Sequence, residues 1–253
     1  MNRFVLMLAF SVGVFVAGVT CGGCANTDRS ASNLKDRMFG PSASELVAMA
    51  FDAEDSDRRR EGVTLLSSRD WGLEEPYLKG YAALLASDTD PRVRSAAVRA
   101  LGKAEDETYL GDVTEALDDP EPQVRRDAAA ALDTLTGEEA VAPLCRRAES
   151  DASSDVRAAC AKALRHYRRP EVVAALIGRL DDPAFAVRYN ARQSLVEITG
   201  RDLGYDSDAW CEAGAEDLLA GADESRQGRP WWDILNISGE DAQTADEKTD
   251  SEE

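Results

Sequence analysis

Histidine is nearly absent from this chain of 253 residues: His166, beside Arg165 and Tyr167, is the single one. Enzymes rely on histidine for proton transfer and metal binding, and no set of His, Cys and carboxylates has metal-ligand spacing. Gly-rich phosphate loops and nucleophile elbows are also missing. We therefore expect a non-enzymatic protein without cofactor or metal, and interpret His166 as a solvated residue at a helix end.

Positive charge is scarce as well, with 29 Lys and Arg against 48 Asp and Glu and a net charge of −19. So acidic a chain repels phosphate backbones, which excludes generic nucleic-acid binding by bulk charge. Aromatic residues make up 6% of the chain, and no small-molecule substrate is evident. The abundant alanine favours helices that pack closely through small side chains.

What the chain has instead is one sequence motif, Val-Arg-x-x-small-x-x-x-Leu, which we call the phrase. It recurs with a nearly constant period. It begins at Val93, Val124, Val156 and Val187, at intervals of 31, 32 and 31 residues. A blurred copy with Arg58 in place of Val lies 35 residues upstream of the first. A period of this length is the signature of a repeat architecture.

Each phrase predicts a helix, because Val, the small residue and Leu are spaced i, i+4, i+8 on one apolar face. We call these the B helices. Asp or Ser accepts hydrogen bonds at a helix start and Pro tolerates the first turn, so we expect the B helices to begin at Asp90-Pro91, Asp119-Pro120, Ser153-Ser154 and Asp182-Pro183.

A second helix is expected before each B helix, with acidic residues near its start, where the helix dipole favours them. These A helices are predicted at about 43–52, 75–86, 107–117, 138–149 and 171–180. Pairing each with its B helix predicts an all-α fold, an α-solenoid of five antiparallel hairpins that share one continuous core.

The Asp-Pro turn, the Val-Arg pair and the Ala and Leu at their offsets resemble HEAT repeats, most closely the short bacterial type related to those of phycobilisome lyases. The resemblance covers about residues 43–200. It implies that the B helices line a concave surface, and it says little about function, because this repeat serves many roles. Arg58 and Gly62 depart from the pattern, so the first copy is interpreted as a capping repeat.

The N-terminal residues predict export. Arg3 precedes an uncharged apolar run from Phe4 to Val19, which is shorter than a spanning helix, so residues 1–24 are interpreted as a lipoprotein-type signal peptide. Cys24, or alternatively Cys21, is the predicted lipidation site, and an ordinary secretory signal is the other reading. Residues 25–42 then form a polar, flexible tether.

The C-terminal residues predict a closing helix and a tail. Residues 208–220 are expected to cover the last hairpin through Trp210, Leu218 and Leu219, which ends a solenoid domain at 43–220. Residues 221–253 are interpreted as an acidic, largely disordered tail. Within it, Trp231 and Trp232 either fold back as a cap or form an exposed aromatic anchor.

The cysteines of the solenoid and the arginines of the phrase each lead to a structural prediction. Cys145 and Cys160 fall on core positions of one hairpin and are interpreted as apolar filler, or as a disulfide in an oxidising compartment, while Cys211 has no evident partner. The arginines of the phrase are expected to form a ladder with the turn aspartates through bidentate pairs. The ladder set is Arg59, Arg94, Arg125, Arg157 and Arg188 with Asp88, Asp119, Asp151 and Asp182.

The segments around the B helices hold 17 Lys and Arg against 7 acids, a net charge of +10, which leaves −29 for the remainder. We therefore predict a basic inner face that receives an acidic segment of a protein partner. The expected binding residues are Arg92, Arg99, Lys103, Arg126, Lys162, Arg165 and Arg192. The prediction is a lipid-anchored interaction scaffold at the bacterial cell envelope; the alternative is a bilin-lyase-like enzyme or a chaperone.

Overall fold

The computed structural model describes residues 40–227, with side chains as far as Gly221, and its main compact unit begins at Ala43. The expectations for the signal peptide, for Cys21 and Cys24, for most of the tether, for the acidic tail beyond Gln227 and for Trp231 and Trp232 lie outside the described residues. No helix of the described part is long and apolar enough to cross a membrane.

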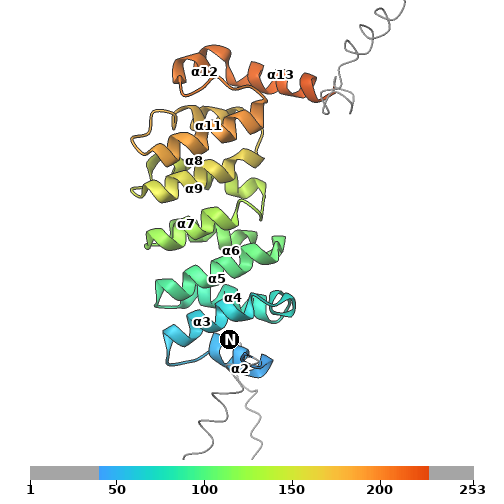
Figure 1. Cartoon of the computed structure of the whole chain (residues 1–253), viewed down its shortest axis with the longest axis vertical. Coiled ribbons are helices and arrows are strands. Elements are labelled where there is room, and N and C mark those ends of the chain that lie inside the picture. Colours follow the sequence, from blue (N-terminus) through green and yellow to red (C-terminus); the bar gives the residue numbers. More distant parts are fainter. Residues whose placement is uncertain (1–39, 228–253) are drawn as a thin grey trace, which may run out of the picture. The chain divides into compact units, whose positions relative to one another are not determined.

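Residues 40–227 contain twelve α-helices and no strand, as the repeat pattern predicts. Consecutive helices pair into hairpins, and neighbouring B helices pack side by side along the stack (Figure 1). The A helices are α2 Ala43–Ala50, α4 Tyr77–Ser87, α6 Leu110–Glu115, α8 Val141–Ser150 and α10 Pro170–Ile177. The B helices are α3 Ser56–Leu66, α5 Pro91–Ala104, α7 Pro122–Ala131, α9 Ser154–Ala163 and α11 Phe185–Thr199.

Short 3-10 turns extend several of these helices. The expected A helices at 107–117 and 138–149 each begin as a 3-10 turn and become α-helical three residues later. The 3-10 segments are Asp70–Leu73, Glu107–Tyr109, Ala116–Asp118, Glu138–Ala140 and Leu164–His166.

The core is built from the residues that recur at the apolar positions of the phrase. The Val, the small residue and the Leu of all four regular copies are 0% exposed, from Val93 to Leu195. Burial of a Leu or Val side chain stabilises the fold by about 1.5–3 kcal/mol. Because the same three positions repeat in every B helix, the core continues from hairpin to hairpin.

Gly62 of the first copy is explained by a close approach of helices. A Cβ at this position would lie 2.1 Å from the backbone nitrogen of Ala50, so α3 can pack on α2 only without a side chain there. On the outer side of α3, Arg58, Arg60 and Glu61 are exposed. The first hairpin thus presents charge at the end of the stack.

The predicted starts of the B helices are confirmed at Asp90-Pro91 and Ser153-Ser154 and are wrong at the other two, where α7 begins at Pro122 and α11 at Phe185. Asp90 caps α5 by accepting a hydrogen bond from the backbone N–H of Arg92, but Asp119 and Asp182 lie before the helix start and do not cap it. Instead each accepts the N–H two residues ahead, from Glu121 and Ala184 respectively, in a tight Asx turn. The turn aspartates therefore shape the A-to-B connection.

The single closing helix predicted at 208–220 is wrong. The chain forms α12 Ser207–Ala213 and α13 Ala215–Gln227, separated at Gly214, whose φ of +69° favours glycine. Trp210 and Leu218 are nevertheless fully buried, and the Trp210 Nε1–H donates to the Gly204 carbonyl at 3.0 Å. Both helices pack against α10, so they close the core as expected.

Candidate interaction surface

The A-to-B turns are joined by a ladder of arginines and aspartates. In each rung, Nε and Nη2 of one arginine donate to the two carboxylate oxygens of the aspartate in the next turn, at distances of 2.7 to 3.1 Å. The four rungs are Arg59–Asp88, Arg94–Asp119, Arg125–Asp151 and Arg157–Asp182. Such bidentate pairs fix orientation as well as charge.

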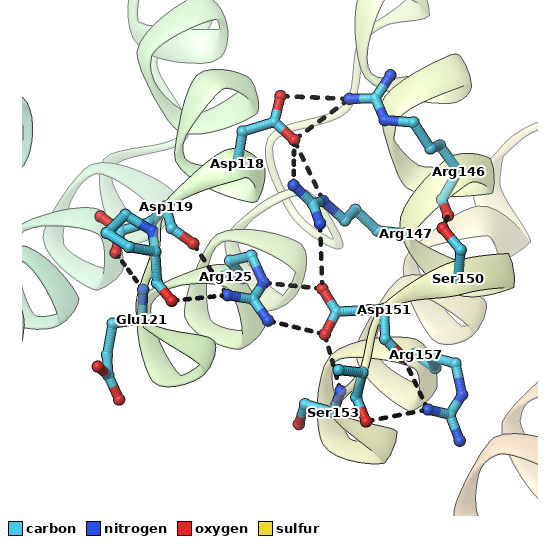
Figure 2. Close-up of polar contacts among 12 residues, drawn as sticks. Asp118, Asp119, Glu121, Arg125, Arg146, Arg147, Ser150, Asp151, Ser153 and Arg157 are labelled. Atoms are coloured by element: carbon cyan, nitrogen blue, oxygen red, sulfur yellow. Dashed lines mark hydrogen bonds and ion pairs between the residues drawn. The ribbon is translucent and has the colours of Figure 1, made fainter.

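The remaining nitrogen of each ladder arginine holds its own turn. Nη1 of Arg125 donates to the carbonyl oxygens of Asp119 at 2.9 Å and Pro120 at 3.1 Å, and Nη1 of Arg157 to the carbonyl of Asp151 at 2.8 Å (Figure 2). One guanidinium therefore bridges two successive turns. The ladder sets the spacing of neighbouring hairpins at their A-to-B edge.

The rungs are sheltered from water, and their charges shift each other's titration. The Asp151 carboxylate is 0% exposed and its Arg125 partner 10%. Hydrogen bonding to Arg157 is the largest effect on Asp182 and holds the pKa of that carboxyl below its usual range, although burial opposes it. The Arg157–Asp182 pair is therefore charged at neutral pH.

Arg188 lacks the aspartate partner that the predicted ladder would give it. Its Nη1 binds the carbonyl oxygens of Asp182 at 2.7 Å and Pro183 at 3.0 Å, like the other ladder arginines. Among the side chains of residues 40–221, however, no aspartate pairs with it, because the chain turns into α12 and α13 instead of another hairpin. Arg188 is the end of the ladder.

Two charge clusters lie on the B helices near the middle of the stack. In the first, Asp127 of α7 is almost fully buried and binds two arginines: Arg99 Nη1 at 2.6 Å and Arg126 Nη2 at 2.7 Å. Ser95 also donates its hydroxyl to Asp127, at 2.5 Å. Two cations share one carboxylate, which leaves this cluster with an excess positive charge.

The second cluster surrounds Asp133, which follows α7. Lys162 Nζ lies 2.9 Å from it, and Arg165 Nε and His166 Nε2 each 3.0 Å. Burial favours a raised pKa for Asp133, but the hydrogen bonds from Lys162 and His166 outweigh it, so its pKa lies below the usual range. Arg165 also lies 3.8 Å from Glu197 at the edge of the cluster.

The other predicted binding residues are less available. Arg92 lies between Asp57 and Asp90, and Arg192 is paired with Asp202, so both are neutralised. Lys103 donates to the carbonyl of Ser67 at 3.1 Å and has no carboxylate partner among the described residues. The surface formed by the B helices α3, α5, α7, α9 and α11, here called the B face, is therefore not uniformly basic; its excess charge is concentrated at α5 and α7.

Sequence reasoning missed Asp127 and Asp133, the two carboxylates that organise these clusters. A signal existed for Asp127: it occupies a helical position where the other regular copies have Ala96, Ala159 and Asn190. A carboxylate at a position that is otherwise small or uncharged indicates a partner on the neighbouring helix. Here the partners are Ser95 and Arg99 of α5.

The described cysteines are free thiols. Cys160 is fully buried, and burial raises its pKa far above the usual range. Cys145 is half-buried, with its pKa raised to about 11 by the same cause, while Cys211 is exposed. Among the described side chains, residues 40–221, no group of three or more His, Cys, Asp or Glu comes together as a metal site.

Comparison with known proteins agrees with this architecture. A family model for HEAT repeats matches residues 78–165 and 142–210. The complex of CpcE and CpcF of phycocyanin lyase from Nostoc sp. PCC7120 is similar with a TM-score of 0.57 and 20% identity, over 69% of this chain and 70% of that one. A designed armadillo repeat protein is similar with a TM-score of 0.51 and 18% identity, over 71% and 96%.

No curated protein sequence gives a significant match. At such low identities the structural neighbours show the fold alone. That fold is a repeat scaffold, which is compatible with binding another protein. The family model covers more than half of the chain, and its repeats coincide with the hairpins and the ladder described above. The chain belongs to the HEAT-repeat family.

Proposed function

We propose that this protein is a non-enzymatic interaction scaffold that binds an acidic segment of a protein partner through the B face. The observation that carries the proposal is the pairing of two arginines, Arg99 and Arg126, with the single carboxylate of Asp127. This cluster holds its cations in fixed positions and retains net positive charge, whereas Lys162 and Arg165 are balanced by Asp133 and Glu197. Anionic side chains of a partner are attracted to it, which favours encounter and sets orientation.

The proposed contacting residues are Arg99, Lys103, Arg126, Lys162 and Arg165, because Arg92 and Arg192 are already paired with carboxylates of this chain. Their side chains come from α5, α7, α9 and the 3-10 turn after α9. Neighbouring B helices pack directly on one another, so these cations lie on consecutive repeats. An extended acidic segment crossing the B helices would meet one cluster after the other.

The site of action is proposed to be the bacterial cell envelope. The apolar run of residues 4–19 and the Cys-containing stretch that follows support export and lipid attachment at Cys24 or Cys21. Several acyl chains would anchor the protein stably to a membrane surface. Mass analysis of the mature N-terminus, with Cys24→Ser and Cys21→Ser variants, tests this part; an unmodified N-terminus contradicts it.

A double charge reversal tests the B face. Lys103 and Lys162 are suitable because neither holds a buried carboxylate alone: Asp133 keeps Arg165 and His166 when Lys162 is replaced. Lys103→Glu with Lys162→Glu should abolish crosslinking to the partner in the native envelope. The matched control is Lys79→Glu with Arg146→Glu, which changes the net charge equally on the exposed A helices α4 and α8.

Both double variants should keep the far-ultraviolet circular dichroism of the parent protein. Retained crosslinking by the Lys103 and Lys162 variant, or equal loss in the control, contradicts the proposal. The similarity to a phycocyanin lyase complex supplies the rival function, an enzyme that attaches bilins. Covalent transfer of a bilin to an apo-phycobiliprotein by this protein would overturn the non-enzymatic reading.

A further inference from the structure

The open end of the ladder at Arg188 has the features of a binding site. In the four complete rungs, an arginine of the same helical position already holds one ligand: the carboxylate of an aspartate, bound through Nε and Nη2. Arg188 has the same anchoring through Nη1 to two carbonyl oxygens of its own turn. Its Nε and Nη2 have no carboxylate partner among the side chains that the structure describes, residues 40–221.

The structure explains why no internal aspartate fills this place. The rungs between regular copies join residues 25 or 26 positions apart. The residue 25 positions after Arg188 is Ala213, the last residue of α12. That helix covers the core through Trp210 and does not form another A-to-B turn. The fold thus closes its apolar core but supplies no aspartate to pair with Arg188 at the end of the ladder.

The surroundings of Arg188 are apolar and exposed. Phe185 is 62% exposed and Tyr189 46%, on the first two turns of α11. Their rings lie 6.0 Å apart, and the Arg188 guanidinium carbon lies 5.6 Å from the Phe185 ring centre. A stacked guanidinium is restricted to few orientations, which lowers the entropy cost of binding a carboxylate. Exposed aromatics beside an arginine are typical of the central residues of interfaces.

We propose that Arg188, Phe185 and Tyr189 bind an aspartate side chain of a partner protein, which takes the place of the missing fifth aspartate. The expected segment resembles two of the four ladder turns of this chain, Leu117-Asp118-Asp119 and Leu180-Asp181-Asp182, in which Leu precedes the aspartate by two residues. Its carboxylate would form the bidentate pair, and its apolar residue would cover the aromatic rings. This site is on the ladder edge and is separate from the clusters at Asp127 and Asp133.

The probe is a synthetic peptide with the sequence of residues 116–123, Ala-Leu-Asp-Asp-Pro-Glu-Pro-Gln, which carries a ladder aspartate and no basic residue. The readout is the Nε–H resonance of Arg188 in the full-length protein, assigned with Arg188→Lys. We expect this resonance to move saturably with the peptide. A peptide with Asn at the Asp119 position should bind at least about tenfold more weakly, because it loses a charge-assisted bidentate pair.

Variants of the protein sharpen the test. Arg188→Lys keeps the charge but loses the two parallel N–H donors of the guanidinium, so we expect weakened binding. Arg201 is an exposed arginine just beyond α11, and the Arg201→Ala variant should bind like the parent. Lys103→Glu with Lys162→Glu should also leave peptide binding unchanged. Failure of this site and failure of the proposed B-face function are thereby distinguished.

Three outcomes would overturn the proposal. The first is an Arg188 resonance that does not respond to millimolar peptide, or that responds equally to the Asp and Asn peptides. The second is a shift of Arg188 in the peptide-free protein when the seven acids of residues 236–253 are replaced by their amides, which would identify the protein's own tail as the occupant. The third is a shift that depends on protein concentration, which would identify a second copy.

Discussion

Arg125 holds Asp151 through two parallel hydrogen bonds, 2.7 Å from Nε and 2.9 Å from Nη2, across the boundary between two hairpins. The same arginine binds the carbonyl oxygens of its own turn. Removal of Arg125 would leave the buried Asp151 carboxylate with Arg147 alone, whose Nη1 lies 3.5 Å away. The ladder is thus a place where single substitutions should have large effects.

We expect Arg125→Ala to lower the free energy of unfolding by about 3–5 kcal/mol, because the Asp151 carboxylate would remain buried and lose its bidentate partner. Urea denaturation measures the change. Arg146→Ala is the control: Arg146 pairs with Asp118, but both side chains are 54% exposed, so the cost should be below about 1 kcal/mol. Similar losses in both variants would contradict the structural role of the rung.

Stability should fall with acid in a defined direction. The pKa of Asp182 is held down by Arg157, so the folded carboxyl keeps its charge at pH values where the unfolded one is protonated. A folded pKa below the unfolded value contributes stability above about pH 4, and this is lost as pH falls through the folded pKa. The free energy of unfolding, measured by urea denaturation between pH 7 and pH 2, should fall at the acid end of this range. Asp182→Asn should be less stable at pH 7 and lose less on acidification.

Gly62→Ala should destabilise the first hairpin. The added Cβ would lie 2.1 Å from the Ala50 backbone nitrogen and would force α3 away from α2, at a cost of about 1–3 kcal/mol. Gly111→Ala is the control, since its nearest neighbour would be a Glu139 side-chain oxygen at 3.8 Å and alanine favours the helix. Thermal unfolding of both variants provides the comparison. An unchanged midpoint for Gly62→Ala would argue against the close contact.

Trp210 should be essential for closure of the core. Its side chain is fully buried between the last hairpin and the C-terminal helices, so Trp210→Ala should cost about 3–5 kcal/mol. It should also expose residues 201–206 to limited proteolysis. Trp71→Ala, at a position that is 36% exposed, should have a much smaller effect. Equal effects at the two positions would mean that α12 is not the closing element.

The cysteines should differ in reactivity. Cys211 is exposed and should be alkylated first in the native protein; Cys145, with a pKa near 11, should react slowly, and buried Cys160 should react after unfolding. Peptide mass mapping after iodoacetamide treatment distinguishes the three. A linked Cys145–Cys160 peptide would instead reveal the disulfide left open by the sequence.

Much of the molecule could be predicted because its information is local and repeated. The period near 31 residues and the Val, small and Leu spacing were sufficient to predict the hairpins and the buried face, since each copy faces the same neighbours. The chemistry of the ladder was also readable, because Arg and Asp recur at constant offsets. Each of these features depends on residues that lie close together or at the same place in every repeat.

Other features depended on contacts between copies that do not repeat. The pairing of each arginine with the aspartate of the next turn, and hence the open position at Arg188, follows from stacking and from the path of α12. Asp127 and Asp133 neutralise part of the B face because the helices bring them beside cations about 30 residues away. Gly214 divides the predicted closing helix. The sequence determined the repeat and its core; only the tertiary structure decided which charges are left unpaired, because pairing depends on distances between side chains of different repeats.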